Sequence, residues 1–153
     1  MPKQSAGILC YRKVKGQLMV LLVHHGGPLW AKRDAGAWSI PKGGIHEDEE
    51  PLEAARREFE EETGARVKGT FIELDSVRQA SGKIVHAWAV EADFNPAELK
   101  SVTFEMEWPP KSGKQQTFPE IDRAEWFTIA AARRKILQGQ TLLLDELVRR
   151  LGM

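Results

Sequence analysis

The 153-residue sequence predicts one domain of the mixed α/β (α+β) class, spanning residues 1–153. A chain of this length is long enough to bury a core but short for two domains. Apolar residues recur with a strand-like period of two in some segments and with a helix-like period in others. These segments do not follow the regular strand-helix-strand order of a doubly wound fold, so that architecture is not expected.

The first third of the chain indicates a hairpin, a loop and a short strand. Aliphatic and β-branched residues fill 6–14 (AGILCYRKV) and 17–25 (QLMVLLVHH), and the Lys-Gly pair between them favours a tight turn. Segment 26–36 (GGPLWAKRDAG) combines glycines, a proline and mixed charges, which is typical of a loop. Segment 38–41 (WSIP) is predicted to be a short strand that leads into two glycines.

Residues 51–63 carry the clearest helix pattern in the chain. Pro51 fits the first helical position, where its missing N–H is not needed. Acidic side chains crowd the first turn, where the helix dipole favours them, and Gly64 suits the position just after the last helical residue.

The second half of the chain indicates further strands followed by helices. The predicted strands are 70–77 (TFIELDSV), 83–90 (KIVHAWAV) and 102–108 (VTFEMEW). FNPAEL and PPKSGK are typical of turns between them. Segment 120–129 (EIDRAEWFTI) leads to the helical stretches 130–137 and 140–151. Leucines in the last stretch form a broad apolar face, which predicts a terminal helix that covers the sheet.

Composition limits the partners and the compartment. Lysine and arginine total 22, as do aspartate and glutamate, so the formal net charge is zero and we expect neither nucleic acid nor a membrane as a partner. Cys10 is the only cysteine, and its apolar neighbours predict a buried thiol in a reducing compartment. No apolar run approaches the roughly 20 residues of a membrane-spanning helix, and the N-terminus lacks a secretory signal core. We therefore expect a cytoplasmic protein, either a monomer or a homodimer.

Residues 43–65 (GGIHEDEEPLEAARREFEEETGA) hold nine acidic side chains against two arginines. On a helix, Glu58, Glu61 and Glu62 lie at positions i, i+3 and i+4 and project from one face. One interpretation is a solvated helix surface with weak ion pairs one turn apart. The other is a site for a hard divalent cation, because magnesium prefers oxygen ligands and would relieve the repulsion among these carboxylates.

The same stretch resembles the Nudix box, the motif of the Nudix hydrolase family. Its fixed positions are filled by Gly43, Glu49, Arg57, Glu58, Phe59, Glu61, Glu62, Gly64 and Ala65. Phe59 is larger and Ala65 smaller than the usual branched aliphatic residues, which indicates different local packing. The later stretch PEIDRAEWFTIAAA resembles the acidic loop, Trp-containing strand and helix that follow the box, so the resemblance covers nearly the whole chain. It implies an α/β/α sandwich around a central mixed β-sheet.

The resemblance implies hydrolysis of a nucleoside diphosphate linked to another moiety, with Mg²⁺ or Mn²⁺ as cofactor. Carried over by position, Glu58, Glu61, Glu62 and the carbonyl group of Gly43 would hold the metal. Bound cations neutralise the phosphates and lower the pKa of a coordinated water, which is why this chemistry uses a carboxylate cluster.

Other box residues are implied to support the metal ligands. Arg57 and Glu49 would form a buried pair that orients the helix and holds Glu58 in place, and Gly64 would end the helix. Arg57 would therefore matter for catalysis without touching the substrate.

The family takes its general base from the box or from a glutamate outside it. Glu120, six residues before Trp126 in the loop ahead of the late strand, is the first candidate. Glu105 and Glu107 are alternatives, and a surface role for Glu120 is the competing interpretation.

Several residues before the box are candidates for substrate binding. Lys42 directly precedes the glycine pair and could meet a phosphate as a point charge. Lys32 and Arg33 are further phosphate candidates, with an exposed solubilising role as the alternative. Trp30 lies in a polar, glycine-rich loop and could stack on a base, whereas core packing is the default for tryptophan.

The sequence favours an enzyme that acts on a nucleotide-type small molecule, with a dinucleoside polyphosphate such as diadenosine tetraphosphate preferred. The motif WxxPKG resembles enzymes that cleave this substrate or diphosphoinositol phosphates, although those usually carry His where this chain has Gly44. The alternatives are an NTP or ADP-ribose pyrophosphatase and a catalytically silent Nudix-like nucleotide sensor. Retention of the box carboxylates favours catalysis over the sensor.

Overall fold

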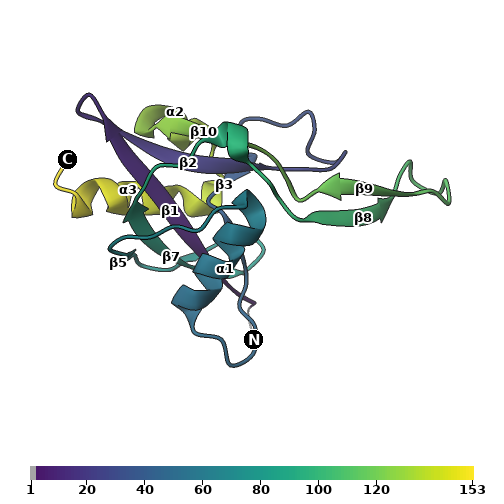
Figure 1. Cartoon of the computed structure of the whole chain (residues 1–153), viewed down its shortest axis with the longest axis horizontal. Coiled ribbons are helices and arrows are strands. Elements are labelled where there is room, and N and C mark those ends of the chain that lie inside the picture. Colours follow the sequence, from purple (N-terminus) through teal and green to yellow (C-terminus); the bar gives the residue numbers. More distant parts are fainter. Residues whose placement is uncertain (1–2) are drawn as a thin grey trace.

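The computed structural model describes residues 3–153, which form a mixed β-sheet, three α-helices and a projecting β-hairpin (Figure 1). The strands are β1 (Gln4–Val14), β2 (Gln17–His25), β3 (Trp38–Ser39), β4 (Lys42–Gly44), β5 (Ile72–Glu73), β6 (Val77–Arg78), β7 (Ile84–Glu91), β8 (Thr103–Glu107), β9 (Gln115–Pro119) and β10 (Ile121–Thr128). The helices are α1 (Pro51–Thr63), α2 (Ile129–Lys135) and α3 (Thr141–Arg150), with short 3₁₀ turns η1 (Pro96–Glu98) and η2 (Gln138–Gln140).

The main sheet has the strand order β10-β2-β1-β7-β5, and β3, β4 and β6 add to β2, β1 and β7 respectively. β1 pairs with β7 in parallel and with β2 and β4 antiparallel, which makes the sheet mixed. β4 carries the first box glycine and lies against the start of β1, where Gly43 is opposite Ala6. The sheet register therefore fixes where the box loop begins.

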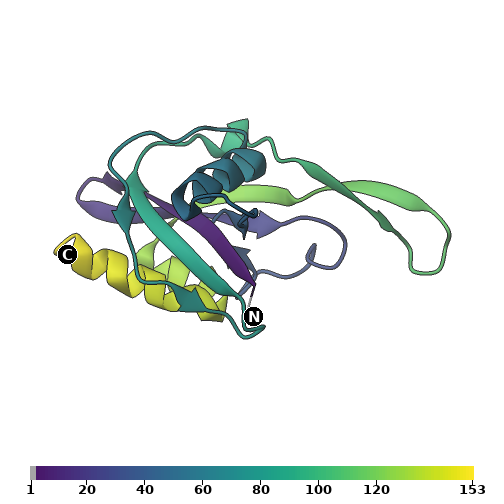
Figure 2. The ribbon, with the colours of Figure 1, turned by 90° about the horizontal axis from the view of Figure 1, so that it is seen from below.

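Helices cover both faces of the sheet (Figure 2). Successive side chains of a strand point to opposite faces, so Ile8 packs in the core beneath α1 while Leu9 packs in the core beneath α2 and α3. α1 buries Phe59 with its two alanines, and α3 buries the leucines predicted to cover the sheet. The expected α/β/α sandwich with a central mixed sheet is confirmed.

Local sequence signals located most elements correctly. The predicted hairpin is formed by β1 and β2, and the helix predicted over 51–63 is α1. Gly64 follows α1 with a φ of 84°, a left-handed conformation that glycine adopts without strain. Cys10 is buried, its thiol contacts the Ala92 carbonyl oxygen at 3.4 Å, and burial raises the pKa of this thiol to about 12.

The strand predicted over residues 70–77 is interrupted. Pairing with β7 continues through Leu74, whose N–H donates to the carbonyl oxygen of Ala87 at 2.9 Å. Val77 then pairs with Val85, so two residues, Asp75 and Ser76, lie opposite the single residue His86 of β7. This extra residue interrupts the pairing, and so β5 and β6 are two short strands. The Asp75 N–H, which points away from β7, donates to a carboxylate oxygen of Glu146 on α3 at 2.7 Å.

β8 and β9 form a two-stranded sheet of their own that projects from the domain (Figures 1 and 2). The sequence predicted β8 and the turn after it, but not β9. Phe104 and Phe118 face each other across this hairpin, with ring centroids 6.0 Å apart. At its tip, the Glu107 carboxylate accepts from the N–H groups of Lys111 and Gly113 and so holds the turn closed.

Within residues 3–153, no helix has the length and apolar character needed to cross a membrane.

Replacing Phe59 by alanine should lower the free energy of unfolding by about 3–5 kcal/mol. The ring is fully buried between α1 and the sheet, and it meets Phe94 edge to face at 6.5 Å. Leu142→Ala on α3 is the matched control, because Leu142 is 69% exposed and should change stability by only about 0.5 kcal/mol. Urea unfolding measures both, and equal losses in the two variants would contradict the packing of α1.

Candidate active site

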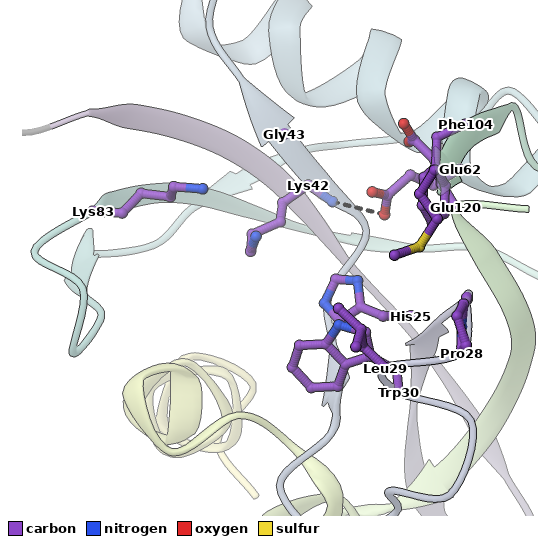
Figure 3. Close-up of a pocket in the computed structure, with 13 residues that line it drawn as sticks. His25, Pro28, Leu29, Trp30, Lys42, Gly43, Glu62, Lys83, Phe104 and Glu120 are labelled. Carbon is purple, nitrogen blue, oxygen red and sulfur yellow. Dashed lines mark hydrogen bonds between the residues drawn. The ribbon is translucent and has the colours of Figure 1, made fainter. Parts of the chain in front are cut away.

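A pocket of about 440 Å³ lies where the loop after β2, the start of β4, the end of α1 and the base of the hairpin meet. Its apolar lining consists of Pro28, Leu29, Trp30, Phe104 and Met106. Its polar lining includes His25, Lys42, Glu62, Lys83 and Glu120. In Figure 3 the two lysines lie on one side, and Glu62 and Glu120 lie together on the other. The pocket thus joins an apolar surface to separate positive and negative groups.

Glu62 is the most deeply buried carboxylate of the box. Its side chain accepts from the backbone N–H of Lys42 at 3.2 Å (Figure 3). Burial raises the pKa of Glu62 to about 8, and the charges of Glu58 and Glu120 act in the same direction. Burial also raises the pKa of Glu58. These carboxylates lie in a place where negative charge is poorly solvated.

The Arg57 guanidinium group ties the box together. Its Nε and Nη2 donate to the two carboxylate oxygens of Glu49 at 2.9 and 3.0 Å, and Nη2 also donates to the Gly44 carbonyl oxygen at 2.9 Å. Its Nη1 donates to Glu58 at 2.8 Å and to Glu61 at 3.2 Å. Hydrogen bonds from Arg57 lower the pKa of Glu49 to about 2. Such forked binding fixes geometry as well as charge.

Gly43 is required by the position of Glu58. A Cβ atom added to Gly43 would lie 2.1 Å from the carboxyl carbon of Glu58, whereas one added to Gly44 would meet nothing within 4 Å. The box loop and the Glu58 carboxylate are therefore in direct contact.

The donor set suits a hard divalent cation. Partly buried carboxylates supply the oxygen ligands that such a cation prefers. A bound cation would also relieve the repulsion between neighbouring carboxylates, which adds to the effect of burial in raising the pKa of Glu58 and Glu62. Glu61 completes the set at the helix surface, with 41% of its side chain exposed. Among residues 3–153, no group of three or more His, Cys, Asp or Glu side chains is arranged to hold a metal ion, and Arg57 binds the carboxylates of Glu58 and Glu61. Glu58, Glu61 and Glu62 are candidate ligands that share one face of α1.

Glu120 lies at the pocket just before β10. Its backbone is fixed on both sides, because its N–H donates to the Val102 carbonyl oxygen at 2.9 Å and its own carbonyl accepts from Gly26 at 2.8 Å. Burial and then the charge of Glu61 raise the pKa of its side chain. The alternatives Glu105 and Glu107 are exposed and alternate along β8 with the pocket-lining Phe104 and Met106. Their side chains point away from the pocket.

Of the four substrate-binding candidates, two line the pocket and two do not. Lys42 and Trp30 line the pocket, and the Trp30 ring lies 4.9 Å from that of His25. Lys32 is exposed and lies outside the pocket lining. The Arg33 guanidinium lies 5.4 Å from the Trp30 ring centre.

Sequence reasoning missed several pocket residues. Lys83 comes from the turn between β6 and β7, which is closed by a 2.8 Å bond from the Gln79 N–H to the Lys83 carbonyl oxygen. Burial, and secondarily Lys83, lowers the pKa of Lys42. Burial also lowers the pKa of His25 to about 4, so this ring is neutral at pH 7. Phe104 and Met106 carried only an alternating pattern, which shows that they share a face but not what that face meets.

The chain belongs to the Nudix family, because a family model of the NUDIX domain matches residues 1–147. The RNA pyrophosphohydrolase of Bartonella henselae is 42% identical over 69 residues, which cover 38% of this chain and 38% of the relative. That of Xylella fastidiosa (strain 9a5c) is 45% identical over 47 residues, covering 30% of this chain and 25% of the relative. The chain thus spans well under half the length of these curated relatives.

Solved structures show the same fold. A Caenorhabditis elegans Ap4A hydrolase, solved as a binary complex, superposes with a TM-score of 0.69 at 21% identity, covering 98% of both chains. The NUDIX domain of Shewanella oneidensis NrtR, solved with ADP ribose, gives a TM-score of 0.64 at 18% identity, covering all of this chain and 90% of that one.

In the presence of a chelator, the free energy of unfolding should fall as pH rises from about 4.5 towards 8 because of Glu62. The folded state binds the Glu62 proton more tightly than the unfolded state, so deprotonation favours unfolding. Glu62→Gln is neutral throughout and should lack this fall, giving a higher melting temperature than the wild type near pH 8. Glu53→Gln, at a 62% exposed position, is the control. Parallel profiles for wild type and Glu62→Gln would contradict the buried carboxylate.

Proposed function

We propose that this protein is a metal-dependent pyrophosphohydrolase that cleaves a phosphoanhydride bond in a nucleoside-diphosphate-linked small molecule. The observation that carries the proposal is that Gly43 and Glu62 of the box line a pocket that also holds two lysines and an apolar wall. A nucleotide has a matching division into an anionic phosphate chain and a flat, largely apolar base.

Glu58, Glu61, Glu62 and the Gly43 carbonyl would hold the cation, with Mg²⁺ favoured and Mn²⁺ as the alternative. When bound, the metal supplies neutralisation of the phosphate charge and a water of lowered pKa. Arg57 positions Glu58 through their 2.8 Å bond, while Glu49 holds Arg57 in turn.

Lys42 and Lys83 bind phosphate oxygens. Among the ion pairs of residues 3–153, neither lysine has a carboxylate partner within 4.0 Å, so both remain available to an anion. Desolvation strengthens such a contact, because the pocket replaces water around the charges. The apolar wall of Trp30, Leu29 and Phe104 receives the base.

Glu120 is the proposed general base. Its carboxylate lines the pocket beside Glu62, and its raised pKa moves it towards the range in which a carboxylate accepts a proton from water effectively. The proton from the attacking water would reside on a Glu120 carboxylate oxygen until release.

The preferred substrate is a dinucleoside polyphosphate such as diadenosine tetraphosphate. The likeness to a structure named Ap4A hydrolase supports this choice. The similarity to RNA pyrophosphohydrolases adds RNA as a competing substrate, and the NUDIX domain of NrtR solved with ADP ribose adds ADP-ribose. A catalytically silent nucleotide sensor is a further alternative. An NTP pyrophosphatase is the remaining alternative.

The test is turnover of a panel of diadenosine tetraphosphate, nucleoside triphosphates, ADP-ribose, diphosphoinositol phosphates and 5′-triphosphorylated RNA, with magnesium and with products resolved by chromatography. We expect one strongly preferred substrate, with turnover abolished by chelation and by Glu62→Gln. Binding without turnover, equal in wild type and Glu62→Gln, would instead support a sensor.

Glu120→Gln should lower kcat by about 10²–10⁴-fold, because it removes the proton acceptor and keeps the size of the side chain. Glu105→Gln is the matched control and should leave kcat unchanged, since Glu105 is exposed on the other face of β8. Steady-state kinetics on the best panel substrate compares them. An unaltered kcat in Glu120→Gln would move the base into the box.

A further inference from the structure

His24, near the end of β2, is fully buried and has a hydrogen-bond partner on each ring nitrogen. Nδ1 lies 2.8 Å from a carboxylate oxygen of Asp122, and Nε2 lies 2.7 Å from the backbone carbonyl oxygen of Arg33. A carbonyl oxygen can only accept, and so can an ionised carboxylate. Both ring nitrogens must therefore donate, which makes His24 a buried imidazolium paired with Asp122.

The two partners lie on two different segments, each of which carries a residue of the pocket lining. Arg33 lies in the loop between β2 and β3, three residues after Trp30, and its N–H donates to the Trp30 carbonyl oxygen at 3.0 Å. Asp122 is the extra residue of a β-bulge between Ile121 and Arg123, two residues after Glu120. One side chain thus connects the apolar wall to the segment that carries the candidate base.

The backbone beside His24 leaves little room for adjustment. A Cβ atom added to Gly26 would lie 2.0 Å from the carbonyl oxygen of Pro119, and the Gly26 N–H donates to the Glu120 carbonyl oxygen. The end of β2 and the entry to β10 are therefore in direct contact. His24 therefore lies close along the chain to a backbone contact with Glu120 and, through Arg33, to the loop that carries Trp30.

Several charged groups surround the His24–Asp122 pair. On β10, Arg123 approaches Asp122 at 3.7 Å. On the loop, Asp34 binds the Trp38 indole N–H at 2.9 Å and pairs with Lys135 of α2. The Trp38 ring packs edge-on to His24 at 5.1 Å, and the neighbouring His25 is neutral. Asp122 is thus the carboxylate that contacts the imidazolium directly.

We propose that His24 is a positioning residue: as a doubly donating imidazolium it holds the loop that carries Trp30 and the Asp122 bulge, which follows Glu120, at the spacing that binds the nucleotide. Its kinetic consequence rests on the proposed function, but its protonation and its hold on the loop do not. A neutral His24 ring would donate only one hydrogen bond, so it would hold either Asp122 or the Arg33 carbonyl oxygen but not both. Substrate affinity should suffer more than the chemical step.

The first experiment requires no ligand. A ¹H–¹⁵N spectrum of the wild-type imidazoles near neutral pH should show both ring N–H groups of His24, protected from solvent exchange. A single ring N–H would overturn the proposal. Amide hydrogen exchange at Arg33 should quicken in Asp122→Asn, which keeps an acceptor but removes the countercharge, and not in His86→Gln. His86 is the matched control, because it lies on β7 and binds Gln4 instead of a pocket element.

The second experiment separates KM from kcat on the best panel substrate, with melting temperatures to verify folding. His24→Gln can satisfy only one of the two acceptors and should raise KM by about tenfold, the scale of one lost charged hydrogen bond, with kcat within about threefold. Folded His24→Gln with wild-type KM would overturn the proposal. Absence of turnover in the wild type would count against the proposed function, and the spectrum and exchange data would still decide the role of His24.

Discussion

The forked contact between Arg57 and Glu49 is the constraint on which the site depends. It joins the box helix to the loop that precedes it, and the same guanidinium reaches Glu58 and Glu61. Without it, the three carboxylates of Glu49, Glu58 and Glu61 would lose the cation they share, and their repulsion would favour an open loop. The Glu58 carboxylate in turn fills the space that a side chain at Gly43 would take. Charge neutralisation and close packing therefore enforce a single arrangement.

The sequence was informative where structure is local. The ends of α1 depend on a proline, an acidic first turn and a glycine, all within the segment itself. The common face of Glu58, Glu61 and Glu62 follows from helix geometry alone. Residues 70–77 were harder, because Asp75 and Ser76 together lie opposite the single residue His86 and interrupt the pairing with β7. The pattern of residues 70–77 does not show which residues of β7 they oppose.

The pocket residues likewise divide into those that local sequence signals identify and those that only tertiary contacts bring together. Lys42 and Trp30 were identified because they stand beside the box or in an obvious loop. Lys83 and Met106 reach the pocket only through sheet pairing and hairpin placement, which sequence spacing does not encode. Lys32 belongs to the same loop as Trp30 but is exposed. The position of a residue in this loop predicts that it lies near the pocket. Whether its side chain points into the pocket depends on the tertiary contacts that shape the loop.

The β8–β9 hairpin lines the pocket without being part of the main sheet. It contributes Phe104 and Met106 to the pocket, yet its hydrogen-bond ladder is independent of the main sheet. Residues on its inner face can diverge without disturbing the packing beneath α1, and changes in its length alter the reach of the wall at little cost to folding. A substitution on the inner face of this hairpin would therefore reshape one wall of the pocket while the strand pairing of the main sheet, which sets where the box loop begins, stays as it is.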